Sequence, residues 1–147
     1  MIKIAITGNI GTGKTTVSQI VKILGYQVFE SDEAVKKILK TKDVVNKIRK
    51  SFKTLKYKLV DKNGDIDKYE LGNFVFSHKE RLKDLENIIH PEIWKMKKGF
   101  IEKNHKSKII FFDIPLLFEK KLQKEFDYVF YTLVSKEIQK QRVLKRK

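Results

Sequence analysis

One short segment near the N-terminus limits what this chain can fold into more than any other feature. Residues 8–15 read Gly-Asn-Ile-Gly-Thr-Gly-Lys-Thr, which fits the pattern Gly, four residues, Gly, Lys, then Ser or Thr. Such a loop surrounds a phosphate with backbone N–H groups, and its glycines permit the close approach and the positive φ angles required. The segment therefore predicts a phosphate-binding loop, with an ordinary glycine-rich turn as the alternative.

The sequence on either side of the loop supports this interpretation. Residues Ile2 to Thr7 are mostly apolar or β-branched, which predicts a buried strand. From Thr15 to Leu24 the apolar residues recur at steps of three and four, which predicts a helix, and Gly25 is a suitable left-handed C-cap. The loop would then lie at a helix N-terminus, whose partial positive charge favours phosphate.

A nucleotide bound to this loop gives its polar residues specific roles. Lys14 is expected to reach the β- and γ-phosphate oxygens, and the Thr15 hydroxyl to bind a Mg²⁺ ion that bridges them. The predicted cofactors are therefore ATP and Mg²⁺. The other cofactor-binding candidates in this segment are Gly8, Gly11, Thr12, Gly13 and Thr16.

Three further segments predict strands. Residues Gln27 to Phe29 favour a second short strand, and Ile109 to Phe112 are apolar at every position, as in a strand covered on both faces. Residues Tyr128 to Val134 predict another buried strand. Because predicted helices separate these strands, the chain is expected to fold as an α/β protein with a parallel sheet flanked by helices.

The middle of the chain is predicted to be a helical insertion within a single domain that spans residues 1–147. The pattern from about residue 41 to residue 104 is mainly helical, and Pro91 is expected to start a new helix there.

Two aspartates follow predicted strands. Asp113 comes after the apolar run that ends at Phe112, where a carboxylate commonly holds Mg²⁺ or its waters; the alternative is a helix cap or turn. Asp32 follows the second strand, so it would face the crevice beyond the carboxyl ends of the sheet and could accept a proton from an acceptor hydroxyl. Its alternative role is helix N-capping, and the two roles are compatible.

Three other polar residues are ambiguous from pattern alone. His90 precedes Pro91 near a helix boundary, and a lone histidine is more often structural than catalytic. Arg142 and Arg146 lie four residues apart on a basic helical segment, where they could clamp phosphates or be solvated. From the pattern alone, solvation is favoured.

Composition narrows the classes of partner. The net charge of +15 invites binding to nucleic acid, but only four of the 33 basic residues are arginines, and the lysines are spread over the whole chain. We therefore expect a lysine-rich solvated surface and no nucleic-acid partner. The chain has no cysteine and no apolar stretch near the about 18 residues of a membrane helix, so we expect a cytoplasmic protein without a membrane partner.

Several separate motifs resemble those of dephospho-coenzyme A (dephospho-CoA) kinases, in the order that this family uses. The similar segments are Thr7–Thr16, Leu24-Gly25 with Val28–Asp32, Asn63–Asp67 with Leu71 and Val75-Phe76, Leu85–Pro91, Asp113–Glu119, and Gln139 with Arg142 and Arg146.

The resemblance implies transfer of the ATP γ-phosphate to the ribose 3′-hydroxyl of dephospho-CoA, a small-molecule substrate, in the last step of coenzyme A (CoA) biosynthesis. It implies that the insertion, at about residues 33–105, binds the acceptor, and that a lid begins at about residue 136. Lys14, Asp32 and Arg142 become the catalytic candidates, with Arg146 near the ATP phosphates and Thr15 and Asp113 as metal ligands. The implied acceptor contacts are Asp32, His90, Pro91, Leu117 and Glu119.

The chain also departs from the family pattern. Glu30 stands where the family commonly has Asp, Lys68 where it commonly has Arg, and Asn9 where a glycine is usual. The chain stops at Lys147, inside the implied lid, so we expect the C-terminal part of the family fold to be missing. Other interpretations are a different small-metabolite or nucleotide kinase, a basic nucleic-acid-associated module and an inactive phosphate-loop fragment.

Overall fold

The chain folds into two compact units. The computed structural model describes residues 1–52, 59–61 and 64–145. One unit, here called the sheet unit, comprises Met1–Asp32 and Gly99–Lys147, and the other, here called the helical unit, comprises Glu33–Lys98. The helical insertion expected from about residue 33 thus starts at the boundary between the units.

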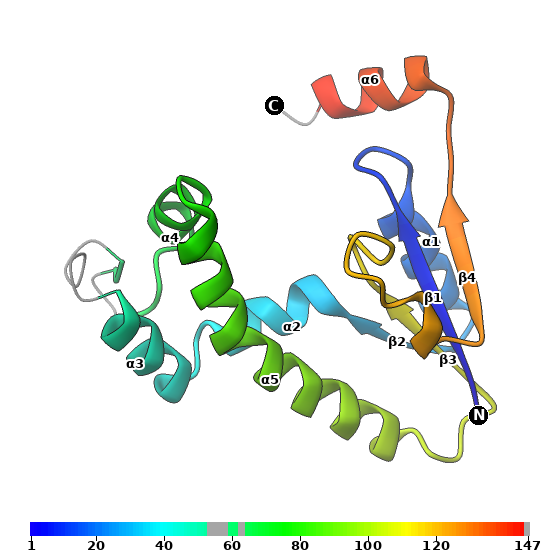
Figure 1. Ribbon diagram of the computed structural model, residues 1–147. Helices are drawn as coiled ribbons and strands as arrows, with labels where there is room; N and C mark the ends of the chain where they lie inside the picture. The colour runs from blue at the N-terminus through cyan, green and yellow to red at the C-terminus, as the bar shows by residue number, and fades with distance from the viewer. Residues whose placement is uncertain (53–58, 62–63, 146–147) are drawn as a thin grey trace. The chain divides into compact units, whose positions relative to one another are not determined.

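The sheet unit is built on four parallel strands (Figure 1). The strands are β1 (Ile2–Gly8), β2 (Gln27–Glu30), β3 (Ile109–Asp113) and β4 (Tyr128–Thr132). Their order is β2-β3-β1-β4, and every pairing is parallel, which confirms the predicted α/β fold. Because Ile6 of β1 pairs with both Asp113 and Phe130, the carboxyl ends of the central strands meet at one edge of the sheet.

Alternate residues of the strands face different layers. Helix α1 (Lys14–Ile23) packs on one face, where Val21 joins Ile4, Ile6 and Phe111 in a buried cluster. On the other face Phe112 contacts three aromatic rings at centroid distances between 5.2 and 5.9 Å: those of Phe29, Phe100 and Phe126. The period-two alternation of a strand places the neighbours Phe111 and Phe112 in different layers.

The predicted C-cap of α1 is present. Gly25 has φ 87°, its N–H donates to the carbonyl of Lys22, and the Tyr26 N–H donates to the carbonyl of Val21. These two bonds form a Schellman motif, which ends the helix and turns the chain into β2.

The helical unit has its own apolar core. Its helices are α2 (Ser31–Ile38), which begins in the sheet unit, α3 (Lys42–Ser51), α4 (Lys68–Phe76) and most of α5 (Lys79–Lys103). Asp67 caps α4 by accepting from the backbone N–H groups of Tyr69 and Glu70. The buried residues of this core are Ile38, Leu39, Val44, Val45, Ile48, Phe52, Leu59, Ile66, Leu71, Val75, Leu85 and Ile89.

Two helical elements complete the sheet unit, the short 3-10 helix η2 (Gln123–Glu125) and helix α6 (Lys136–Leu144). Ser135 caps α6 by accepting from the N–H of Ile138. Over the described ranges, no helix combines the length and the apolar character needed to cross a membrane.

Three local predictions were wrong. Pro91 does not start a helix but lies inside α5, because the loss of one backbone hydrogen bond is offset by apolar contacts on both sides, made by Ile89 and Ile93. Asp32 lies inside α2 rather than capping it, since that helix follows β2 directly at Ser31. Strand β4 is not buried: Tyr128 is 60% exposed, and among the described strands β4 pairs with β1 alone.

The two isoleucines Ile48 and Ile23 test where the cores lie. Ile48 of α3 is 0% exposed, whereas Ile23 of α1 is 84% exposed. Ile48→Ala should lower the free energy of unfolding by about 2–5 kcal/mol, because it leaves a cavity in the core of the helical unit. Ile23→Ala should change it by less than about 0.5 kcal/mol. Urea denaturation followed by circular dichroism measures both, and equal effects would contradict this assignment of the core.

Candidate active site

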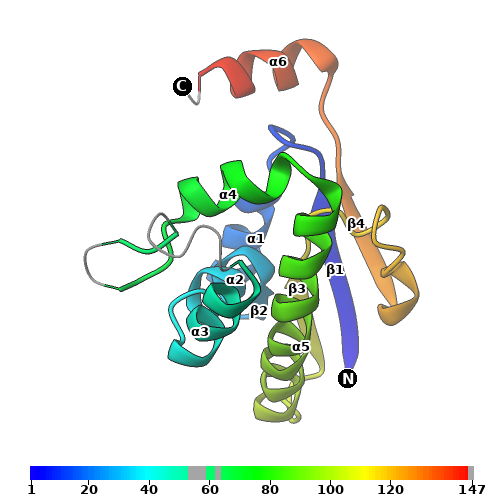
Figure 2. The ribbon, with the colours of Figure 1, turned by 60° about the vertical axis from the view of Figure 1, so that its left-hand side comes forward.

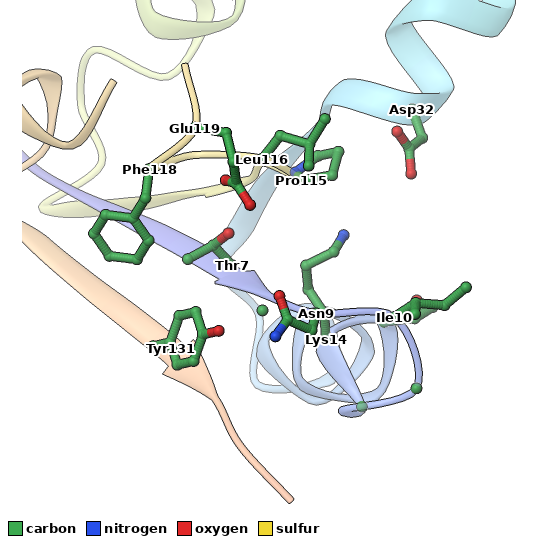
Figure 3. Close-up of a pocket in the computed structure, with 14 residues that line it drawn as sticks. Thr7, Asn9, Ile10, Lys14, Asp32, Pro115, Leu116, Phe118, Glu119 and Tyr131 are labelled. Atoms are coloured by element: carbon green, nitrogen blue, oxygen red, sulfur yellow. The ribbon is translucent and has the colours of Figure 1, made fainter. Parts of the chain in front are cut away.

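A cavity of about 630 Å³ opens at the carboxyl ends of the strands in the sheet unit (Figure 3). It lies between the loop that follows β1, the segment that follows β3, the end of β4 and the first turn of α2. Its lining residues are Thr7, Gly8, Asn9, Ile10, Gly11, Gly13, Lys14, Thr15, Asp32, Pro115, Leu116, Phe118, Glu119 and Tyr131. The predicted phosphate-binding loop therefore forms one side of a cavity large enough for a small-molecule ligand.

Close packing explains why the loop needs glycine at Gly8 and Gly11. A Cβ atom on Gly8 would lie 2.0 Å from the Thr132 Oγ1 and 2.9 Å from the Thr132 carbonyl oxygen. At Gly11, where φ is 80°, a Cβ would lie 3.0 Å from a methyl group of Val143 and 3.2 Å from the Gln139 carbonyl oxygen. The loop is thus packed from outside by the end of β4 and by α6.

Hydroxyl groups join the loop to the end of β4. The Thr12 hydroxyl donates to the Asn9 carbonyl at 2.7 Å, and its oxygen lies 2.8 Å from the Thr132 hydroxyl oxygen. The Thr132 hydroxyl also lies 3.2 Å from the Thr7 carbonyl oxygen, to which it can donate. Thr12 is buried and does not line the cavity, so its hydroxyl fixes the loop to the end of β4. Its predicted role in nucleotide binding stays a prediction.

Helix α6 also contacts the phosphate-binding loop. In two views it lies beside the turn between β1 and α1 (Figure 1 and Figure 2). The Gln139 side-chain amide donates to the Ile10 carbonyl at 2.8 Å, and an Arg142 guanidinium nitrogen lies 3.5 Å from the Gly11 carbonyl oxygen. Arg142 therefore contacts the loop, although it does not line the cavity itself.

The two predicted ATP- and metal-binding groups Lys14 and Asp113 contact each other. The Lys14 ammonium forms an ion pair with one carboxylate oxygen of Asp113, and the Ser18 hydroxyl donates to the other oxygen at 2.7 Å. Asp113 is buried and Lys14 reaches the cavity from α1, so Lys14 stands between Asp113 and the cavity space.

Two carboxylates line the cavity. Asp32 projects from the first turn of α2, and Glu119 from the segment after β3, and both are exposed. In Figure 3 the side chains of Asp32, Glu119 and Lys14 all point into the space above the loop. A carboxylate on this side of the cavity can receive a proton, and the lysine and the loop N–H groups can hold phosphate oxygens.

An apolar wall completes the cavity, and sequence reasoning did not find it. The wall consists of Pro115, Leu116, Phe118 and Tyr131, and the Phe118 and Tyr131 rings lie 5.9 Å apart. Leu116 has φ 57°, an uncommon conformation for a leucine, which turns the chain after β3. No signal in the sequence points to this backbone conformation.

The other predicted site residues lie elsewhere. Thr16 is exposed on α1 but does not line the cavity, and Leu117 is fully buried in the sheet unit and does not line it either. His90 and Pro91 are exposed residues of α5 in the helical unit. Arg146 lies outside the described residues, as does Asn63. The roles predicted for these residues stay predictions.

The oxygen donors suit a Mg²⁺ ion that arrives with a nucleotide. Within the described part of the chain, no three acidic or histidine side chains gather to hold a metal ion alone. Mg²⁺ commonly binds through one or two protein oxygens, substrate phosphates and water. The Thr15 hydroxyl lines the cavity, and the Asp113 carboxylate is linked to it through Lys14, so this donor set fits the ion.

Gly8 and Gly99 offer a matched test of the loop packing. Gly8→Ala should weaken ATP binding at least about 10-fold, because the new methyl group would displace the loop from Thr132. Gly99→Ala should leave ATP binding unchanged, since a Cβ there has no atom within 4 Å and lies inside helix α5. Isothermal titration calorimetry with ATP measures both variants, and a Gly8→Ala variant that binds normally would refute the packing argument.

Comparisons with known proteins bear on the family and on the fold. The sequence model of the dephospho-CoA kinase family matches residues 2–147. A dephospho-CoA kinase of Fusobacterium nucleatum is 38% identical over 143 residues, which cover 97% of this chain and 72% of that protein. One from Bartonella quintana is 35% identical over 145 residues, with the same coverage of 97% and 72%.

Solved structures share the fold. A crystal structure of a Thermus thermophilus protein has a TM-score of 0.81 at 32% identity and covers 99% of this chain and 72% of that chain. A dephospho-CoA kinase from Campylobacter jejuni has a TM-score of 0.69 at 22% identity, with coverage of 98% and 94%, and supports the fold alone. On the family match over nearly its whole length, this chain belongs to the dephospho-CoA kinase family.

Proposed function

We propose that this protein transfers the γ-phosphate of ATP to the ribose 3′-hydroxyl of dephospho-CoA, which gives CoA and ADP. One observation carries the proposal: in a chain of this family, the phosphate-binding loop and the Asp32 carboxylate line the same cavity of the sheet unit. The reaction is the final step of CoA biosynthesis, and its substrate is a small molecule.

The loop is assigned to the phosphates of ATP. Its backbone N–H groups and the N-terminus of α1 supply a positive potential where the nucleotide's negative charge lies. Lys14 would leave its ion pair with Asp113 to bind β- and γ-phosphate oxygens, where it stabilises the charge that moves to the leaving ADP. Arg142 and Arg146 are proposed to add positive charge to the same phosphates, and Thr16 a contact at the start of the helix.

Thr15 and Asp113 would hold Mg²⁺ together with the phosphates. When bound, the ion neutralises phosphate charge and polarises the phosphorus–oxygen bond that breaks. The chain's own contribution is an oxygen pair of one hydroxyl and one carboxylate near the end of the loop.

Asp32 is proposed as the general base. Its carboxylate oxygen accepts the proton of the 3′-hydroxyl while the hydroxyl oxygen forms a bond to the γ-phosphorus. The bond from that phosphorus to the bridging oxygen breaks, and its electron pair leaves with ADP. Asp32 lies on the cavity wall, and no side chain in the described part of the chain pairs with its carboxylate, which leaves it open to a substrate.

The acceptor is assigned to the apolar wall and its neighbours. Pro115, Leu116, Phe118 and Tyr131 offer apolar and aromatic surface of the kind that binds a planar base or an alkyl chain. Glu119 lies beside this wall and is proposed to bind a polar group of dephospho-CoA, while Leu117 supports the wall from the core. His90 and Pro91 of α5 are proposed as further acceptor contacts.

Acceptor choice tests the proposed reaction. In a coupled assay of ADP release with ATP and Mg²⁺, the 147-residue chain should turn over with dephospho-CoA. It should not turn over with AMP or adenosine, which lack the phosphopantetheine arm. Turnover with AMP or adenosine in place of dephospho-CoA would overturn the substrate assignment and favour another nucleotide kinase.

Asp32 and its neighbour Glu33 give a matched pair of variants for the proposed base. Asp32→Asn should lower kcat by about 10²- to 10⁴-fold with little change in ATP affinity, because the amide cannot accept the proton. Glu33→Gln removes an exposed carboxylate that pairs with Lys36, and it should leave kcat unchanged. Unchanged turnover in Asp32→Asn would remove this residue from the mechanism.

A further inference from the structure

Ser18 is a fully buried polar residue of α1 that neither the sequence motif nor the proposed reaction uses. Its side chain is 0% exposed and lies one helical turn beyond Lys14. A serine inside a helix commonly donates its hydroxyl proton back to the carbonyl four residues earlier. Here the Ser18 hydroxyl donates instead to the Asp113 Oδ2 at 2.7 Å, across 95 residues of sequence.

The Asp113 carboxylate is held by two donors from one helix. Lys14 pairs with Oδ1 and Ser18 donates to Oδ2, so each oxygen has its own partner. Lys14 and Ser18 can both reach Asp113 because residues four apart share one face of a helix. With Asp113 6% exposed, an unbonded oxygen there would lose its hydration without replacement.

The two donors differ in what happens to them when a nucleotide binds. In the proposed function, on which this inference rests, Lys14 turns to the phosphates and leaves Asp113. Ser18 cannot follow, because its side chain is short and fully buried. Among the side chains that the structure describes, Ser18 is then the remaining hydrogen-bond donor to the Asp113 carboxylate.

We propose that Ser18 is a positioning residue: its hydroxyl holds Oδ2 of Asp113 so that Oδ1 stays available to Mg²⁺ when Lys14 moves to the phosphates. A hydrogen bond to a ligating carboxylate restricts its rotation and favours the one orientation that meets the ion. Ser18 itself touches neither the nucleotide nor the ion, so it acts through Asp113 alone.

The test measures binding rather than turnover. Ser18→Ala and the unaltered chain are titrated by calorimetry with the β,γ-imido analogue of ATP, once with Mg²⁺ and once with EDTA. In EDTA the two affinities should agree within about 2-fold, because the loop and Lys14 are intact. With Mg²⁺ the variant should lose about 10-fold of the tightening that the ion produces in the unaltered chain, as is typical when a supporting hydrogen bond to a ligand is removed.

Val21→Ala is the control for a merely structural effect. Val21 is a buried residue of the same helix, and its apolar side chain belongs to the cluster with Ile4, Ile6 and Phe111. The variant removes packing from α1 and should lower the melting temperature, yet keep the full Mg²⁺-dependent tightening. If Ser18→Ala kept that tightening, or if Val21→Ala lost it equally, the positioning role would be refuted.

The Asp113→Asn variant distinguishes a failure of this inference from a failure of the proposed function on which it rests. If Asp113→Asn loses the Mg²⁺-dependent tightening and Ser18→Ala does not, only the role of Ser18 fails. If Asp113→Asn keeps the tightening, the metal role of Asp113 fails and the inference falls with it. Loss in both variants, with the Val21→Ala control unaffected, supports the proposal.

Discussion

The close contact between the phosphate-binding loop and the end of β4 is the constraint on which the site depends. No side chain fits at Gly8, because a Cβ would meet Thr132 at 2.0 Å, and Gly11 is nearly as crowded by α6. This packing, together with the Thr12 and Thr132 hydroxyls, holds the loop against the sheet. The packing therefore fixes the arrangement of the loop N–H groups, which is the preorganisation that charge stabilisation needs.

Charged side chains lie around this loop at different depths from the cavity. Asp113 is buried behind it, Lys14 stands at its centre, and Asp32 and Glu119 face the cavity. The Lys14 ammonium and the buried Asp113 carboxylate neutralise each other in their ion pair. When phosphates compete for Lys14, they replace one anionic partner by another, and the buried Asp113 needs a second donor. The Ser18 hydroxyl is such a donor, because it already bonds to the Asp113 Oδ2.

The structural features that could be predicted from the sequence are those that depend on residues close together in the chain. The loop, the helix after it and the Gly25 cap are encoded within about 25 residues, so motif and periodicity sufficed. Thr132 and Ser18 were missed because their hydrogen bonds join residues more than 90 positions apart, for which the pattern carries no signal. Tyr131 was missed because its place on the cavity wall depends on how β4 pairs in the sheet. The strand at β4 was predicted, but its exposure was not, since an apolar run does not reveal how many neighbours a strand has.

The position of Asp32 at the cavity was predicted correctly, although its predicted role as a helix cap was wrong. It does not cap a helix, yet it remains at the carboxyl end of β2, whose last residue Glu30 pairs with Asp113 of β3. Helix α2 starts at Ser31 without a loop, and neither glycine nor proline lies between Glu30 and Ile38. The carboxylate is therefore positioned by a paired strand and a continuous helix, and regular elements hold reactive groups more closely than loops do. The topology of a parallel sheet, rather than the capping role, determines where this carboxylate lies.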